Sequence, residues 1–212
     1  MKQTAAEIVR EYGPFPGVDC VHGVSFDGCR VWMATGARLD AFDPESGEML
    51  DPINVAADAG TTFNGEHLFQ IAEGLIRKID PKTGEVLATI PAPGEGGDSG
   101  LAWAEGSLWV GQHRGRKIHQ VDPETGKVLR TIESDRFVTG VSWVDGELWH
   151  ATSENHESDI RRVDPSNGEV LELMKMPAGA DVTGLESDGG DRFFCGGGDQ
   201  PLVRTVRKPA RD

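Results

Sequence analysis

Short apolar runs alternate with glycine, proline and aspartate along the whole chain. The pattern is clearest between residues 98 and 132, where apolar runs occupy 101–103, 108–110, 117–121 and 127–132. Runs of this kind, bounded by turn-forming residues, predict β-strands joined as hairpins. We therefore expect this segment to form four short antiparallel strands in succession.

Nearly everything else in the chain repeats this unit. An Asp-Pro turn followed by glycine recurs four times, beginning at Asp43, Asp80, Asp122 and Asp164. Proline pre-sets φ for such a turn, and glycine supplies the positive φ at its end. A glycine also opens the first strand of each unit, at Gly23, Gly60, Gly100, Gly140 and Gly184. Their intervals are 37, 40, 40 and 44 residues.

A period of about 40 residues with four strands per unit is typical of propeller blades. The sequence thus predicts an all-β, five-bladed β-propeller with four antiparallel strands per blade, in a single domain over residues 1–212. The last unit lacks a fourth strand, and segment 6–12 matches the fourth-strand pattern of 84–90. We expect this N-terminal segment to complete the last blade and close the ring, which removes exposed sheet edges. An amphipathic N-terminal helix is the alternative.

Alternating strand directions sort the loops onto two ends of the propeller. Loops between second and third strands share one end with the loops that join successive blades. That end, here called the variable-loop face, includes segments 112–116, 150–159 and 195–201, whereas the Asp-Pro turns lie at the other end. Rigid scaffolds carry function on variable loops. We therefore expect a site on this face, at the mouth of the central channel.

Four residues in the longer loops of blades three and four are candidate catalytic groups: His113, His150, His156 and Glu154. Imidazole and carboxylate groups suit acid–base catalysis or metal binding near neutral pH, so a divalent metal ion is one candidate cofactor. Ligand contact without catalysis, or a solvated or structural role for the histidines, are the alternatives.

Five further residues are candidates for substrate binding: His22, Glu73, Asp98, Arg114 and Arg136. Either arginine could hold a carboxylate through two parallel hydrogen bonds, which indicates an anionic small molecule as ligand. The alternative is that both arginines pair with neighbouring carboxylates. The five tryptophans recur at equivalent positions of the blades and are expected in the core.

Composition narrows the partners and the compartment. A net charge of −14 disfavours nucleic acid and anionic membranes as partners. Neither a membrane-spanning apolar run nor an apolar leader is expected from the sequence. Cys20, Cys29 and Cys195 are an odd number without metal-ligand spacing, and they indicate reduced thiols in a cytoplasmic protein.

Segment 22–36, HGVSFDGCRVWMATG, resembles the opening motif of the plant-type and bacterial glutaminyl cyclotransferases, and 182–189, VTGLESDG, echoes it. Virginiamycin B lyase-like propellers share the general blade pattern. The resemblance implies a five-bladed propeller. However, the family's functional glutamate falls on Met33 and its serine on Ala34, and segment 139–142 has no carboxylate. The family's catalytic residues are thus not matched.

These observations favour a small-molecule enzyme, with lyase, hydrolase or cyclotransferase-like chemistry at a His/Glu/Arg site. A propeller that binds a ligand or a protein through the same face without catalysis is the alternative. A third hypothesis is a scaffold whose acidic sides dock a basic partner.

Overall fold

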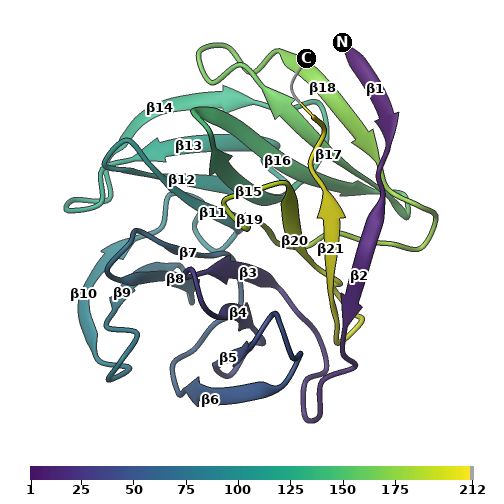
Figure 1. Ribbon diagram of the computed structural model, residues 1–212. Helices are drawn as coiled ribbons and strands as arrows, with labels where there is room; N and C mark the ends of the chain where they lie inside the picture. The colour runs from purple at the N-terminus through teal and green to yellow at the C-terminus, as the bar shows by residue number, and fades with distance from the viewer. Residues whose placement is uncertain (211–212) are drawn as a thin grey trace.

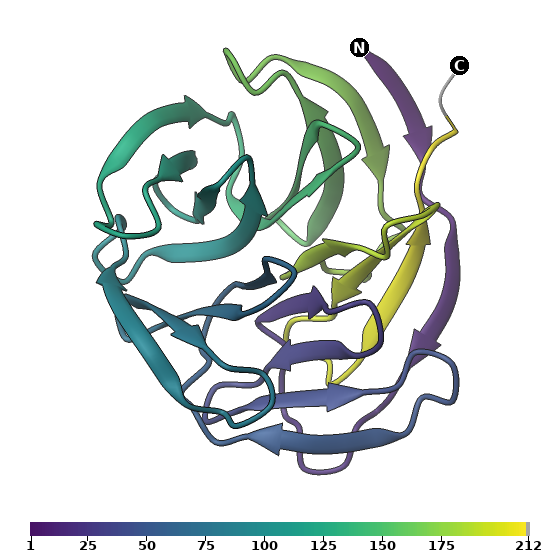
Figure 2. The same ribbon diagram turned by 60° about the vertical axis from the view of Figure 1, so that its left-hand side comes forward.

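Five antiparallel sheets are arranged around a central axis in the computed structural model, which describes residues 1–210 (Figures 1 and 2). Within these residues no helix forms, and accordingly none is long and apolar enough to cross a membrane. Each blade contains four antiparallel strands that lie side by side from the axis outward, and the sheet of one blade has a fifth strand at its edge. The predicted five-bladed β-propeller is confirmed.

The first three blades follow the chain without interruption. Blade one consists of β3 (Gly23–Phe26), β4 (Val31–Ala34), β5 (Leu39–Phe42) and β6 (Met49–Ile53). Blade two consists of β7 (Thr61–Phe63), β8 (Leu68–Ala72), β9 (Leu75–Ile79) and β10 (Val86–Pro91). Blade three consists of β11 (Asp98–Ala104), β12 (Ser107–Gln112), β13 (Lys117–Val121) and β14 (Val128–Glu133).

The last two blades both involve the N-terminal segment. Blade four consists of β15 (Val138–Val144), β16 (Glu147–Glu154), β17 (Glu157–Val163) and β18 (Val170–Lys175). Blade five consists of β19 (Leu185–Ser187), β20 (Arg192–Gly196), β21 (Val203–Arg207) and the N-terminal β2 (Ile8–Tyr12).

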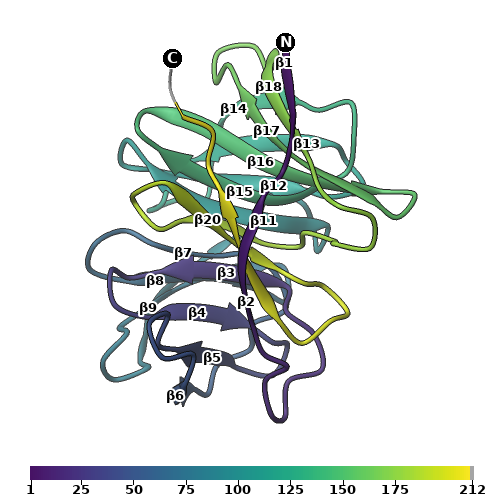
Figure 3. The same ribbon diagram turned by 45° about the vertical axis from the view of Figure 1, so that its right-hand side comes forward.

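The ring closes as the sequence predicted, by a strand and not a helix. β2 pairs antiparallel with β21, with Tyr12 opposite Val203, and the two strands lie side by side in Figures 1 and 3. The closing strand also contacts blade one, because the Tyr12 hydroxyl donates to the Pro44 carbonyl at 2.8 Å. The N-terminal segment therefore completes blade five and joins it to blade one.

One strand was not predicted. β1 (Lys2–Ala5) pairs in parallel with β18, so the sheet of blade four has a fifth strand at its outer edge. Ala6 and Glu7, which belong to no strand, then carry the chain over to blade five. The N-terminal segment thus covers an edge of one blade before it completes the next.

The glycines that open the first strands form a closed ring around the axis. A Cβ on Gly60 would lie 2.5 Å from the Leu101 nitrogen, and one on Gly100 would lie 2.6 Å from the Val141 nitrogen. Gly184 makes the corresponding approach to Val24 of blade one. The axial space that these residues line is too small for a water molecule. The channel is therefore shut at this level, and a ligand has access only to loops and clefts around it.

Aromatic side chains fill the interfaces between blades. Trp103 stacks on Phe69 of blade two with ring centroids 5.4 Å apart, and Trp143 stacks on Trp109 of blade three at 5.3 Å. Such pairs add to the stabilisation from apolar burial. The tryptophans thus belong to the core, as the sequence predicted.

Candidate functional site

The nine candidate residues fall into four places on the propeller. Glu73, Asp98, His113 and Arg114 line a pair of cavities between blades two and three. Arg136 and Glu154 belong to a network of ion pairs, with His150 buried next to it. His156 is exposed at a loop tip, and His22 lies in the loop that enters blade one. The structure therefore brings four of the nine together at the cavities and three others together in or beside the network.

The two cavities adjoin each other on the variable-loop face, and we call them together the blade 2–3 cleft. The first, of about 520 Å³, is lined by Asp58, Ala59, Ile71, Glu73, Gly74, Glu95, Gly96 and Asp98. The second, of about 600 Å³, is lined by Gly94, Glu95, Gly96, Gly97, Asp98, Gln112, His113, Arg114 and Gly115. Asp98 is the buried residue that both cavities share.

Asp98 is the first residue of β11 and is only 9 % exposed. Its Oδ2 accepts a hydrogen bond from the Gly94 backbone N–H at 3.1 Å, but its buried Oδ1 has no partner. Burial raises the pKa of this carboxyl, and the Gly94 hydrogen bond only partly opposes the effect. A buried carboxyl oxygen without a partner is costly, and such a group in a native structure calls for a structural or functional explanation.

A glycine-rich turn holds the cleft open next to this carboxylate. The Gly97 N–H donates to the Gly94 carbonyl at 2.8 Å, and the His113 N–H donates to the Gly97 carbonyl at 3.0 Å. A Cβ on Gly94 would lie 2.5 Å from Asp98 Oδ1 and 2.8 Å from Gln112 Nε2. Only glycine therefore lets the turn pass this close to the carboxylate.

The other polar side chains of the cleft differ in their packing, their exposure and their ion-pair partners. The His113 ring packs on Phe137 with centroids 4.8 Å apart, and burial together with the adjacent Arg114 lowers its pKa, so the imidazole is neutral at pH 7. Arg114 is exposed at the rim. The Glu73 carboxylate pairs with Arg77 and is held beside Asp58, whose Oδ2 accepts from the Glu73 N–H at 3.2 Å.

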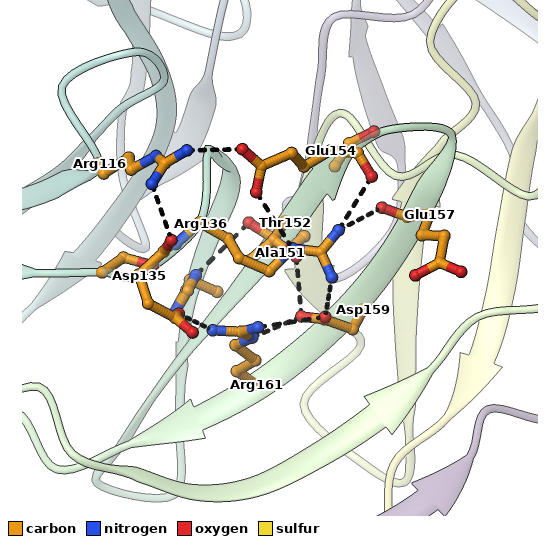
Figure 4. A network of polar contacts seen from close by, with 12 residues as sticks. Arg116, Asp135, Arg136, Ala151, Thr152, Glu154, Glu157, Asp159 and Arg161 are labelled. Atoms are coloured by element: carbon orange, nitrogen blue, oxygen red, sulfur yellow. Dashed lines mark hydrogen bonds and ion pairs between the residues drawn. The ribbon is translucent and has the colours of Figure 1, made fainter.

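A network of ion pairs joins blades three and four beside the cleft (Figure 4). The Glu154 carboxylate accepts from Arg116 Nη2 at 2.6 Å. Arg136 donates to Asp159 Oδ2 at 3.0 Å and to the Glu157 carbonyl at 2.8 Å. These contacts hold the loop between β16 and β17 against the segment that leads from blade three into blade four. Glu154 and Arg136 thus have structural partners, and we leave them out of the proposed site.

Arg161 continues the network into the sheet. It donates to Asp159 Oδ1 at 2.6 Å and also contacts Asp135. His150 lies directly opposite Arg161 in the β16–β17 pairing and is 2 % exposed. Burial, followed by the Arg161 charge, lowers the pKa of His150 to about 4, so this ring is neutral and enclosed at pH 7.

The metal hypothesis gains no support from the geometry. Among residues 1–210 no three or more His, Cys, Asp or Glu side chains are grouped so that they could hold an ion. His113, His150 and His156 come from different environments: a cleft wall, a sheet interior and an exposed loop tip.

Sequence reasoning missed three features of the variable-loop face. Gln112, the last residue of β12, and Asp58, in the loop before β7, line the cleft, and only their position on the variable-loop face could have indicated this. The Gly-Glu-Gly-Gly run before Asp98 was a usable signal, because such a run commonly permits a close backbone approach. The third feature is a contact between Cys20 and His22, treated below.

The fold and this cleft define a five-bladed β-propeller with a polar cleft between two blades, and comparisons with known proteins agree on the fold. The chain is similar to a glutaminyl cyclase of Myxococcus xanthus, with a TM-score of 0.79 and 21% identity over 100% of this chain and 99% of that one. It is less similar to the WD40 β-propeller domain of Doa1, with a TM-score of 0.58, 18% identity and coverage of 89% and 64%.

A family model described as outer membrane protein assembly factor BamB matches residues 72–171, from blade two to blade four. No curated protein matches the chain. The resemblance to glutaminyl cyclotransferases that the sequence indicated is thus confirmed for the fold.

Proposed function

We propose that this propeller is a small-molecule enzyme of lyase, hydrolase or cyclotransferase-like class, with Asp98 as the acid–base group of the blade 2–3 cleft. The observation that carries the proposal is the Asp98 carboxyl, buried between two cavities with one oxygen unpartnered. Perturbed carboxyls in clefts are characteristic of functional sites. The similarity in fold to a glutaminyl cyclase supports the cyclotransferase-like option.

The charges around the cleft favour a substrate that carries both an amine and a carboxylate or carbonyl. Asp58 and Glu95 line the first cavity and would attract a cationic amine. Arg114 at the rim of the second cavity would hold an oxyanion or carbonyl oxygen, and the neutral His113 would add a hydrogen bond.

The raised pKa of Asp98 suits proton transfer. A larger fraction of the carboxyl is protonated near neutral pH than for an ordinary aspartate, so the group can donate a proton to a leaving group and recover it afterwards.

A cytoplasmic location and the exclusion of nucleic acid and membranes as partners remain predictions from charge and cysteine content.

Asp98→Asn is expected to lower turnover at least about a hundredfold, because the amide keeps the shape and the Gly94 hydrogen bond but cannot transfer a proton. Free amino acids and N-terminal glutaminyl dipeptides are the probes, with binding followed by calorimetry and turnover by ammonia release and product mass. Glu105→Gln, at the exposed turn between β11 and β12, is the matched control and should leave both unchanged.

Binding without turnover in the unmodified protein would favour the non-catalytic ligand-binding alternative. Equal turnover in the Asp98→Asn and Glu105→Gln variants would remove Asp98 from the chemistry. If the unmodified protein neither binds nor turns over any of these probes, the proposal is overturned.

A further inference from the structure

A cysteine and a histidine contact each other on the variable-loop face, away from the blade 2–3 cleft. Cys20 Sγ lies 3.0 Å from His22 Nε2, and both side chains are partly buried and partly accessible. They belong to the loop that leads from the closing strand into blade one. The other two cysteines differ from Cys20, since Cys29 is exposed and Cys195 is buried.

The backbone between the two residues holds them in this arrangement. Val21 is fully buried, its N–H donates to the Gly198 carbonyl at 2.9 Å, and its carbonyl accepts from the Thr183 hydroxyl. In an extended chain, residues i and i+2 project to the same side. With Val21 fixed toward the interior, Cys20 and His22 therefore project together toward the surface, and their contact is preorganised.

The surrounding charges define the chemistry of the thiol. Burial, with the carboxylates of Asp19 and Asp199, raises the pKa of Cys20, so the sulfur is protonated at neutral pH. A protonated thiol is a weak nucleophile unless a base removes its proton. The His22 imidazole is the group in contact that can accept it.

We propose that Cys20 and His22 are a nucleophile–base pair that undergoes thiol–disulfide exchange with small cationic disulfides. In the reaction the Cys20 proton passes to His22 Nε2 while the sulfur attacks one sulfur of the disulfide. The disulfide bond breaks as the new S–S bond forms. The departing thiolate takes the proton from the imidazolium, which leaves a mixed disulfide on Cys20 and one free thiol. Asp19 and Asp199 favour a cationic over an anionic disulfide.

The experiment compares cystamine, a dication, with dithiodipropionate, a dianion, on the full chain at pH 7. Peptide mass spectrometry at timed intervals gives separate rates for Cys20 and Cys29, so the exposed Cys29 serves as an internal control. With cystamine, Cys20 should react at least about tenfold faster than Cys29, and the preference should shrink with the dianion. His22→Gln should lower the Cys20 rate at least about tenfold and leave the Cys29 rate unchanged.

The unmodified protein supplies a second readout that does not depend on how the variant folds. The preference of Cys20 for cystamine over dithiodipropionate should shrink as salt is added, because salt screens the charges of Asp19 and Asp199. A Cys20 rate with cystamine no higher than that of Cys29, or a Cys20 rate that His22→Gln leaves unchanged in a folded variant, would overturn the proposal.

Discussion

Replacement of Gly60 by alanine is expected to destabilise the protein by at least about 3 kcal/mol, which corresponds to a fall in Tm of roughly 6–12 °C. A Cβ at this position would lie 2.5 Å from the Leu101 nitrogen, 2.6 Å from the Gly100 carbonyl carbon and 2.8 Å from the Ser99 carbonyl oxygen. All three are backbone atoms, so no side chain can turn away to make room.

The closed ring of blades increases the loss of stability that this one methyl group causes. Blade two can move away from blade three only by compressing its contact with blade one, where a Cβ on Gly23 would already lie 2.6 Å from the Ala59 carbonyl oxygen. Because closed packing transmits such strain, relief at one interface creates a clash at the next.

Urea and thermal unfolding followed by tryptophan fluorescence measure the effect of Gly60→Ala. Gly190→Ala is the matched control, because Gly190 is exposed, does not require a positive φ, and has no atom nearer than 3.4 Å to the added Cβ. We expect the control to change stability by less than about 0.5 kcal/mol. A similarly small change for Gly60→Ala would show that the first strands are not in the close contact described here.

The sequence predicted the propeller well because the same sequence features recur in every blade. Asp-Pro turns, opening glycines and short apolar runs keep the same order and spacing, so a strand that is ambiguous in one blade can be assigned from its equivalents in the others. The closing strand was predictable for the same reason, since 6–12 matches a fourth strand. β1 was not, because Lys2–Ala5 has no apolar alternation and its pairing depends only on the edge of β18 being within reach.

The candidate site was predictable only as far as topology reaches. Strand order places Asp98 and His113 on one face, and the structure puts both in one cleft. Strand order does not predict which charged side chains pair: Glu154 forms an ion pair with Arg116, which is 38 residues away in the sequence. The Cys20–His22 spacing is visible in the sequence, but their contact depends on Val21 pairing with Gly198 at the far end of the chain.

A second large effect is expected at Glu186, in the first strand of blade five. Ser142 of blade four donates to Glu186 Oε1 at 3.0 Å, and the Ser187 N–H donates to the same oxygen at 2.8 Å. Burial nevertheless dominates these hydrogen bonds and raises the pKa of Glu186 from an ordinary 4.5 to about 7. The folded protein therefore binds this proton more tightly than the unfolded chain does.

The direction of the pH dependence follows from this difference. The stabilisation from the protonated Glu186 is fully present below pH 4.5 and is lost as the pH rises through about 7, where the carboxyl ionises in the folded state. The shift corresponds to about 3.4 kcal/mol at most. Because Glu186 keeps some exposed surface, solvent screening reduces the expected loss to about 2–3 kcal/mol.

Glu186→Gln keeps an oxygen that accepts from Ser142 and Ser187 but removes the ionisation. We expect this variant to be about 2–3 kcal/mol more stable than the unmodified protein at pH 8 and nearly equal to it at pH 4.5. Urea unfolding at half-unit pH steps measures the difference between the two proteins, which cancels the titration of the other carboxylates. Glu124→Gln, in an exposed Asp-Pro turn, should show a small difference that does not change with pH. The prediction fails if the difference in unfolding free energy between Glu186→Gln and the unmodified protein is also constant from pH 4.5 to 8. That result would mean that the Glu186 carboxyl is hydrated in the folded protein despite its contact with Ser142.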